Sequence, residues 1–400
     1  MNKHRIDWGP LLAPRAAAIH ASVYPKFGAL PEHPDVINFK GGVPAAECLP
    51  IGRLRQSICH AWEVEPDVLG YAESEGYLGL RELIAERMAR RGAPVSPHEV
   101  LVTNGSQQGL ELIAKLLLEP GDRVVVEGPT YFGALQIFDI YQATYDVVPM
   151  DEEGIDPVAL EATLQREPRP KLIYLIPTFQ NPAGVSLSPE RRRAVVELSR
   201  RYNVPIVEDD PYGELWFERD LGPLRALDPD VLYLGTFSKT LAPALRMGWL
   251  VAPPELMQRL IDSKESVDIQ SDRVMQRAVV ETAGAGWLDR HLERVRPLYR
   301  ARRDHLLARL AQEMPPGTRW TRPGGGFFVW VTLPAGRSAD ELLQRAAAAG
   351  VQYYPGSSFY PNTCQRPTFR LGYTTLPEER ITEGLARLGT VARAQANASG

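Results

Sequence analysis

An apolar run at residues 171–177, KLIYLIP, is the feature that most narrows the possible folds of this chain. After its first residue it carries no charge, which is typical of a strand covered on both faces in a parallel sheet. Further strand-like segments lie at residues 100–103, 124–126, 204–207 and 231–234. Helical patterns lie between several of them, at residues 107–118 and from Ser188 to about residue 202. Strands alternating with helices predict the α/β class, with a mainly parallel sheet sandwiched by helices.

The pattern changes after about residue 283. We expect a long arginine-rich helix at residues 287–313, followed by short strands and one helix at residues 327–331, 339–349, 352–354 and 368–371. A chain of 400 residues is also too long for one simple core. We therefore predict an N-terminal arm with part of the small domain at residues 1–50, a large domain at 51–285 and a small α+β domain at 286–400.

Charge and cysteine content argue against several functional classes. The net charge is −4 and the arginines are scattered, so we expect no nucleic-acid partner. No segment approaches the roughly 18 apolar residues of a membrane span, and residues 1–14 lack the core of a signal peptide. We therefore expect a cytoplasmic location and no membrane partner. The three cysteines lack the spacing of a disulfide framework or zinc site, and no metal is expected.

Polar residues gather where predicted strands end, which is where α/β proteins bind ligands. Residues 103–108 (TNGSQQ) lead into a helix, whose free N–H groups suit a phosphate, although an ordinary helix cap is the alternative. Residues 177–184 hold Asn181 between two prolines, which could be only an Asx turn. Residues 207–212 end a strand with Asp209, where acids commonly cap the next turn. No histidine lies nearby, so a metal site there is disfavoured.

Lys239 is the candidate nucleophile. The chain has seven lysines, and this one follows the strand-like residues 231–234 and precedes Arg246 by seven positions. A lysine that is desolvated near other cations has a lowered pKa and can attack carbonyl groups. The alternative is a solvated loop lysine, which is the commoner case for an arbitrary lysine.

The motifs GSQQ, NPAG, DDPY, SK and R, in this order, are together highly specific. They resemble the pyridoxal-5'-phosphate (PLP) aminotransferases of fold type I, class I/II. The nearest subgroup contains 2-aminoadipate, kynurenine and multi-substrate aromatic or branched-chain aminotransferases. The resemblance runs from residues 39–44 (FKGGVP) to residues 369–373 (FRLGY). It implies a large PLP-binding domain and a smaller α+β domain.

The resemblance also implies a role for each cofactor-binding residue. Lys239 holds PLP covalently and later moves the substrate's α-proton, while Asp209 pairs with the protonated pyridine nitrogen and keeps the ring an electron sink. Asn181 and Tyr212 donate hydrogen bonds to the phenolic oxygen of the ring. Tyr131 stacks on the pyridine face, with an ordinary core or exposed tyrosine as the alternative. The residues that would hold the phosphate are Ser106, Gln107, Thr236, Ser238 and Arg246.

Substrate binding and assembly follow from the same resemblance. Arg370 matches the arginine that clamps the substrate α-carboxylate, although a surface strand arginine is the alternative. Gly42, Asn181 and Tyr24 complete the expected substrate-binding set. Tyr71 matches a tyrosine that reaches the phosphate site of the other subunit, which implies a homodimer with shared active sites.

The implied reaction moves the amino group of an α-amino acid to a 2-oxo acid such as 2-oxoglutarate. Relatives that accept acidic side chains carry an arginine where this chain has Pro25. Tyr24, Phe27 and Leu30 would offer an apolar wall instead. We therefore favour a neutral aromatic or aliphatic amino donor, with 2-aminoadipate still open.

Two other classes of function remain open. The same PLP residues would serve a β-lyase, racemase or decarboxylase on this fold, because fold alone does not fix the reaction. A family of transcription factors joins this fold to a DNA-binding helix-turn-helix. Only about 40 residues precede Gly41 and Gly42, and they are not basic enough for such a domain, so we do not favour a ligand-sensing regulator.

Overall fold

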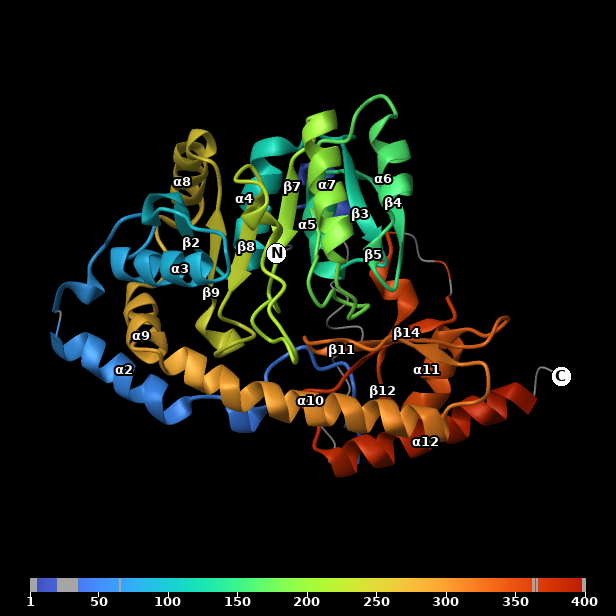
Figure 1. The fold of residues 1–400 in the computed structure, drawn as a ribbon. Helices are drawn as coiled ribbons and strands as arrows, with labels where there is room; N and C mark the ends of the chain where they lie inside the picture. Colours follow the sequence, from blue (N-terminus) through green and yellow to red (C-terminus); the bar gives the residue numbers. More distant parts are fainter. Residues whose placement is uncertain (1–5, 20–34, 65, 362–363, 365, 398–400) are drawn as a thin grey trace, which may run out of the picture.

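The computed structural model describes residues 6–19, 35–64, 66–361, 364 and 366–397. Within them, eight strands form one central sheet in the order β2-β9-β8-β7-β6-β3-β4-β5 (Figure 1). Neighbouring strands are parallel except at β9 and β5. The strands are β2 (Val100–Asn104), β3 (Arg123–Gly128), β4 (Thr144–Asp151), β5 (Gly154–Ile155), β6 (Leu172–Leu175), β7 (Ile206–Asp209), β8 (Leu232–Thr236) and β9 (Met247–Val251).

Helices cover both faces of this sheet, because successive side chains of a strand point to opposite faces. Val124 and Val126 of β3 pack with α4, α5 and α8, whereas Val125 packs with α6 and α7 on the other face. The helix α3 covers that second face beside β2 and β9. The helices are α3 (Leu78–Arg90), α4 (Ser106–Leu117), α5 (Phe132–Ile140), α6 (Pro157–Leu164), α7 (Pro189–Tyr202) and α8 (Pro254–Asp268). The predicted α/β class and the mainly parallel sheet are confirmed.

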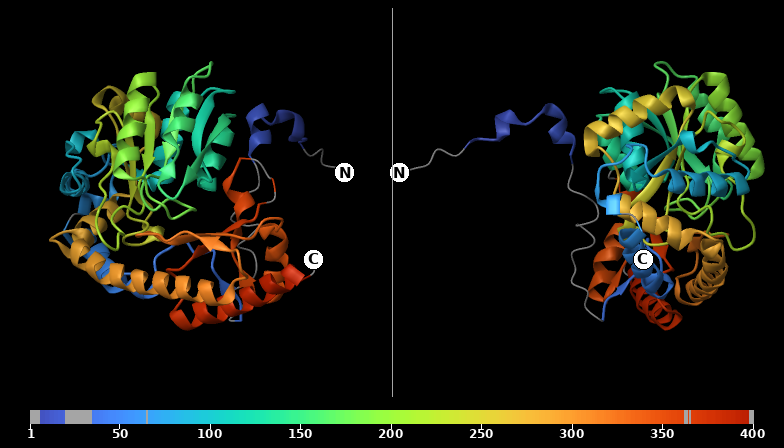
Figure 2. Two further views of the ribbon diagram at one scale, coloured as in Figure 1. Left: turned by 45° about the vertical axis from the view of Figure 1, so that its right-hand side comes forward. Right: turned by 90° about the vertical axis from the view of Figure 1, so that its left-hand side faces the viewer.

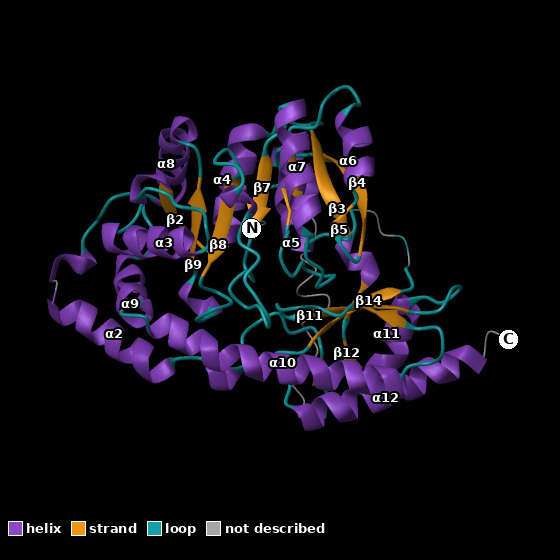
Figure 3. Ribbon diagram, viewed as in Figure 1, coloured by secondary structure: helices purple, strands orange, loops and turns teal. Residues whose placement is uncertain are grey.

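A smaller antiparallel sheet lies below the central one, with the order β10-β11-β14-β13 (Figure 3). Its strands are β10 (Arg319–Trp320), β11 (Phe328–Thr332), β13 (Tyr354–Pro355) and β14 (Thr368–Gly372). The helices of this region are α2 (Ile51–Val64), α9 (Arg273–Ala283), α10 (Trp287–Glu313), α11 (Ala339–Ala348) and α12 (Glu378–Asn397). The bounds of α10 are those that the sequence predicts.

Two further short strands, one near the start of the chain and one in its C-terminal part, pair with each other. β1 (Ile37–Asn38) pairs in parallel with β12 (Val351–Gln352), so residues 37–38 lie beside the C-terminal region. This pairing agrees with placing part of residues 1–50 in the small domain, although the domain boundaries themselves remain a prediction. Residues 352–354, expected as one strand, instead end β12 and begin β13 in two different sheets.

The described N-terminal segment, residues 6–19, extends outward from the main body of the molecule beside α5, with which it is in contact (Figure 2). It contains the 3-10 helices η1 (Gly9–Leu11) and η2 (Pro14–Ala18), and its large apolar side chains, Trp8 among them, are exposed. In the described part of the chain, no helix is both long and apolar enough to span a bilayer.

Candidate active site

A cavity of about 370 Å³ lies at the carboxyl ends of the parallel strands, between the central sheet and the smaller sheet. The parallel strands β2, β6, β7 and β8 end on the same edge, so residues that are far apart in sequence meet there. Twelve of the predicted site residues line this cavity: Gly42, Ser106, Gln107, Tyr131, Asn181, Asp209, Tyr212, Thr236, Ser238, Lys239, Arg246 and Arg370.

Lys239 lies three residues beyond the end of β8, and its Nζ donates a hydrogen bond of 2.6 Å to the carbonyl oxygen of Gly42. The pKa of Lys239 is lowered to about 8, mainly by loss of hydration and also by the cationic Arg370 and Arg246, while the carboxylate of Asp209 opposes the shift. A larger fraction of this amine is therefore neutral and nucleophilic near neutral pH than is usual for a lysine.

Asp209, the last residue of β7, is only 5% exposed. The hydroxyl of Tyr174 donates to its Oδ2 at 2.7 Å, whereas its buried Oδ1 has no hydrogen-bond partner among the described residues. Burial raises the pKa of Asp209 to about 6. A buried carboxylate oxygen without a donor is costly, so this oxygen is suited to a ligand that brings a donor or a positive charge.

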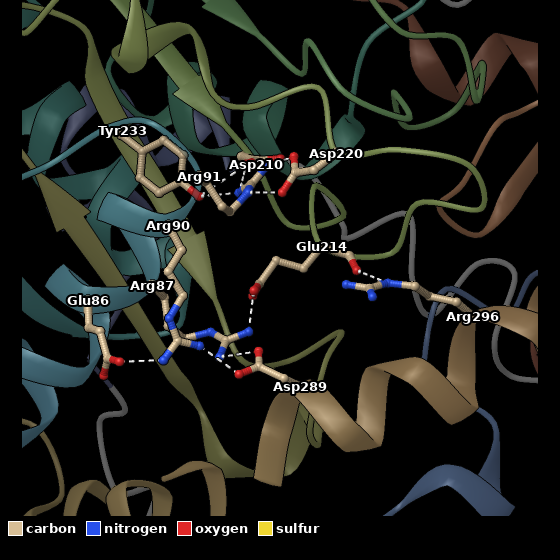
Figure 4. A network of polar contacts seen from close by, with 10 residues as sticks. All are labelled: Glu86, Arg87, Arg90, Arg91, Asp210, Glu214, Asp220, Tyr233, Asp289 and Arg296. Carbon is tan, nitrogen blue, oxygen red and sulfur yellow. Dashed lines mark hydrogen bonds and ion pairs between the residues drawn. The ribbon is translucent and has the colours of Figure 1, made fainter. Parts of the chain in front are cut away.

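The neighbouring Asp210 points elsewhere, into a network that ties α3 to the loop after β7 (Figure 4). Arg91 donates to Asp210 Oδ2 at 2.6 Å and to Asp220 Oδ2 at 2.8 Å. Tyr233 donates to the same oxygen of Asp210 at 3.1 Å. Of the two adjacent acids, Asp209 alone lines the cavity, and Asp210 is part of the scaffold that supports it.

An anion cradle forms where α4 begins. Gly105, with φ of 76°, precedes Ser106 and Gln107, which begin the helix and line the cavity. The Ser238 backbone N–H donates to Thr236 Oγ1 at 3.1 Å. Arg246 donates to Asn104 O at 3.2 Å and lies 3.4 Å from Ser238 Oγ. Helix N–H groups, hydroxyls and a guanidinium together suit a phosphate.

Gly248 of β9 makes this cradle possible. A Cβ at this position would lie 2.5 Å from the backbone of Gly105 and Ser106, closer than any real contact. We expect Gly248→Ala to destabilise the protein by about 1–3 kcal/mol, because the backbone atoms must move apart. Gly52→Ala in α2 is the matched control, since a Cβ there meets nothing within 4 Å. Urea unfolding compares the two, and equal midpoints would contradict this reading of Gly248.

The opposite side of the cavity belongs to the smaller sheet. Arg370 of β14 donates to Asn181 Oδ1 at 2.7 Å and to the carbonyl oxygen of Lys40 at 2.9 Å. Its guanidinium carbon lies 3.9 Å from the centre of the Phe328 ring. Arg370 is therefore a buried cation held in place by the loop after β6, the segment after β1 and the ring of Phe328 in β11, and the alternative of a surface arginine is wrong.

The two predicted tyrosines of the cavity differ in their surroundings. Tyr212 is buried, and its ring centre lies 5.2 Å from that of Phe327 and 5.8 Å from that of Phe328. Tyr131 is partly buried just before α5, with its ring centre 5.3 Å from that of Phe132. Tyr131 is therefore neither an exposed nor a fully buried core tyrosine.

The structure places one further predicted residue outside this cavity and does not describe another. Tyr71 is 83% exposed and does not line it. Tyr24 lies outside the described residues, together with Pro25, Phe27 and Leu30.

Several cavity residues were not predicted as site residues. They are Lys40, Val43, Phe132, Ile176, Pro211, Pro243, Phe328 and Tyr354. Some of them are neighbours in sequence of a predicted motif. Lys40, for example, directly precedes Gly41 and Gly42, and this position was the sequence signal that could have identified it as a site residue. The strand-like pattern around Tyr354 indicated only an element of the small domain.

A family model described as aminotransferase class I and II matches residues 35–388. The chain is 39% identical over 394 residues to aromatic-amino-acid aminotransferase 1 of Thermococcus litoralis, covering 96% of this chain and 94% of that protein. It is 39% identical over 391 residues to 2-aminoadipate transaminase of Thermus thermophilus, covering 96% and 97%. A crystal structure of Pyrococcus horikoshii kynurenine aminotransferase, in complex with PMP, matches with a TM-score of 0.93 and 37% identity, covering 97% of this chain and 98% of that one.

Proposed function

The chain belongs to the class I and II aminotransferases, and on this premise we propose that it moves the amino group of a neutral aromatic or aliphatic amino acid to 2-oxoglutarate. The supporting observation is the position of Lys239, whose amine lies in one cavity with Asp209 and Arg370. A nucleophilic amine, a buried carboxylate and a buried guanidinium are the groups that such a transfer requires.

The cofactor of this family is PLP, and the residues of the cavity fit it. The unpartnered Oδ1 of Asp209 would accept a hydrogen bond from a protonated pyridine nitrogen. The cradle at Ser106 and Arg246 would take the phosphate, and the amine of Lys239 would take the aldehyde. When bound, PLP supplies an electron sink that makes the α-proton of the substrate removable.

The protein's own residues then divide the remaining work. Arg370 would hold the α-carboxylate with its planar guanidinium, which Asn181 and the Lys40 carbonyl keep oriented. Lys239 Nζ would accept the α-proton and later give a proton back on the cofactor side of the amino nitrogen, two bonds from the α-carbon. In the cofactor-free protein, the hydrogen bond to the Gly42 carbonyl positions this nitrogen. Tyr131 and Tyr212 would contact the ring, and we propose that Tyr212 donates to its phenolic oxygen.

The choice of amino donor rests on the lining of the cavity. Tyr131, Phe132, Phe328 and Tyr354 present aromatic surface, which suits an aromatic or aliphatic side chain. The decisive experiment is a panel of amino acids with 2-oxoglutarate, read as glutamate formed. We expect neutral donors to give the highest kcat/KM. If 2-aminoadipate is the only donor that gives glutamate, the donor proposal is overturned. Release of a keto acid and ammonia in the absence of 2-oxoglutarate would indicate a β-lyase.

The lowered pKa of Lys239 makes a prediction about cofactor loading. Only the neutral amine attacks an aldehyde, so covalent capture of PLP by cofactor-free protein should rise about tenfold per pH unit below pH 8 and level off above it. Stopped-flow absorbance in the near-visible range measures this, with Lys239→Ala as the blank. A rate that still climbs beyond pH 10 would contradict a perturbed lysine.

We propose that the protein is a homodimer. Large apolar side chains are exposed near Tyr71, including Trp62, Val64 and Leu69. Val267 and Ile269 at the end of α8 are exposed as well, and the N–H of Ala72 donates to Gln270 Oε1, which joins the two segments. Large apolar side chains exposed on neighbouring segments are typical of an interface between subunits.

Tyr71 should complete the phosphate site of the partner subunit. We expect Tyr71→Phe to weaken PLP retention without unfolding the protein. Mixing inactive Lys239→Ala chains with inactive Tyr71→Ala chains should restore part of the activity, because one site of the hybrid has both residues. Native mass spectrometry, which separates the hybrid from the parent dimers by mass, verifies that hybrids form, and sedimentation tests for a monomer. Hybrids without recovered turnover, or an active monomer, would exclude a shared site.

A further inference from the structure

Lys40 places another cation at the same cavity. It follows β1, lines the cavity and is 8% exposed. Its Nζ donates a hydrogen bond of 2.6 Å to Gln352 Oε1 of β12. Loss of hydration lowers the pKa of Lys40 to about 8, so a fraction of the amine remains protonated at neutral pH. None of the roles described above uses this ammonium group.

The ammonium group of Lys40 and the guanidinium of Arg370 contact the same aromatic ring. Lys40 Nζ lies 5.9 Å from the centre of the Tyr354 ring, and Arg370 Cζ lies 4.9 Å from it. The two cations are therefore at most about 11 Å apart. Extended, a five-carbon dicarboxylate separates its carboxyl carbons by about 5 Å, given C–C bonds of about 1.5 Å. With a charge-assisted hydrogen bond of about 2.8 Å at each end, such a ligand needs a separation of the two cations close to this upper limit.

We propose that Lys40 binds the distal carboxylate of a dicarboxylate 2-oxo acid while Arg370 holds the carboxylate next to the keto group. The proposal rests on the proposed function, in which 2-oxoglutarate is the acceptor.

Gln352 explains how one cavity serves both an acidic acceptor and a neutral donor. With a neutral side chain present, Lys40 keeps its hydrogen bond to Gln352, and the buried ammonium group stays satisfied. The ring of Tyr354 then offers apolar surface to the donor. With a dicarboxylate present, Lys40 turns from the neutral amide oxygen to the carboxylate, which is the stronger acceptor.

A structural role for Lys40 is the competing explanation, because its bond to Gln352 also ties the segment after β1 to β12. Two ligands and three variants separate these explanations. Isothermal titration calorimetry on PLP-loaded protein compares glutarate, a dicarboxylate, with 4-methylpentanoate, a monocarboxylate of similar length. Lys171→Met is the matched control, because Lys171 is exposed and lies outside the cavity.

We expect Lys40→Met to weaken glutarate binding about 10- to 100-fold and 4-methylpentanoate binding by less than about threefold. Lys40→Arg keeps the charge and should retain glutarate binding within about fivefold. Gln352→Glu keeps the tie to β12 but holds the ammonium in an ion pair, so it should also weaken glutarate selectively. A purely structural role predicts no such loss in Gln352→Glu.

Equal weakening of both ligands, or unchanged glutarate binding in both Lys40→Met and Gln352→Glu, overturns the proposal. Failure of the proposed function looks different. If the wild type forms no glutamate from 2-oxoglutarate with any donor while glutarate binding still depends on Lys40, the acceptor is wrong and the carboxylate site stands.

Discussion

Lys239→Ala is expected to abolish amino transfer while leaving the fold intact. Loss of a positioned acid–base group commonly slows a reaction by about 10²–10⁴-fold, and this variant also loses the covalent attachment of the cofactor. We therefore expect turnover to fall by at least about 10⁴-fold. Glutamate formation from the best donor measures the loss. Lys171→Ala is the control, since Lys171 is exposed and does not line the cavity.

A second measurement tests, independently of activity, whether Lys239 is the residue that binds the cofactor covalently. The loaded wild type should be yellow, and borohydride should fix the mass of the cofactor onto the peptide that contains Lys239. The variant should still bind PLP through the phosphate cradle at Ser106 and Arg246, but release it on denaturation. Normal turnover in Lys239→Ala, or fixation on another lysine, would show that the nucleophile lies elsewhere.

The sequence predicts the part of the site that lies at the ends of parallel strands. Asp209 and Thr236 end the apolar strands β7 and β8, and Lys239 lies three residues beyond β8. Parallel strands must bring their carboxyl ends to one edge. Sequence patterning also predicts α10 with its observed bounds. Predictions of such local features succeed because the features depend on neighbouring residues within one helix or strand.

Features that depend on contacts between distant parts of the chain are harder to predict from the sequence. The strand pattern alone does not show which of Asp209 and Asp210 faces the cavity. In the structure Tyr174 contacts Asp209, which lines the cavity, whereas Arg91 contacts Asp210. Lys40 and Arg370 meet through Tyr354, although 330 positions separate the two cations. The strand β9 was missed as well, because an antiparallel strand within a mostly parallel sheet leaves no alternation of strand and helix to detect.

Asp209→Ala should lower turnover by about 100-fold or more while PLP is retained in part. The reason is electrostatic, because a carboxylate beside the pyridine nitrogen keeps it protonated, and removing a stabiliser of this kind commonly costs about 10²–10³ in rate. Tyr174→Phe is the matched comparison. It removes the 2.7 Å hydrogen bond to Asp209 Oδ2 but leaves the charge, so its loss should be smaller. Steady-state kinetics with the same amino donor compares the turnover of the two variants, and the absorbance of the bound cofactor measures how much PLP each retains. A two- or threefold loss in Asp209→Ala would show that Asp209 only caps the turn after β7, and the partner of the ring nitrogen would have to be sought elsewhere in the cavity.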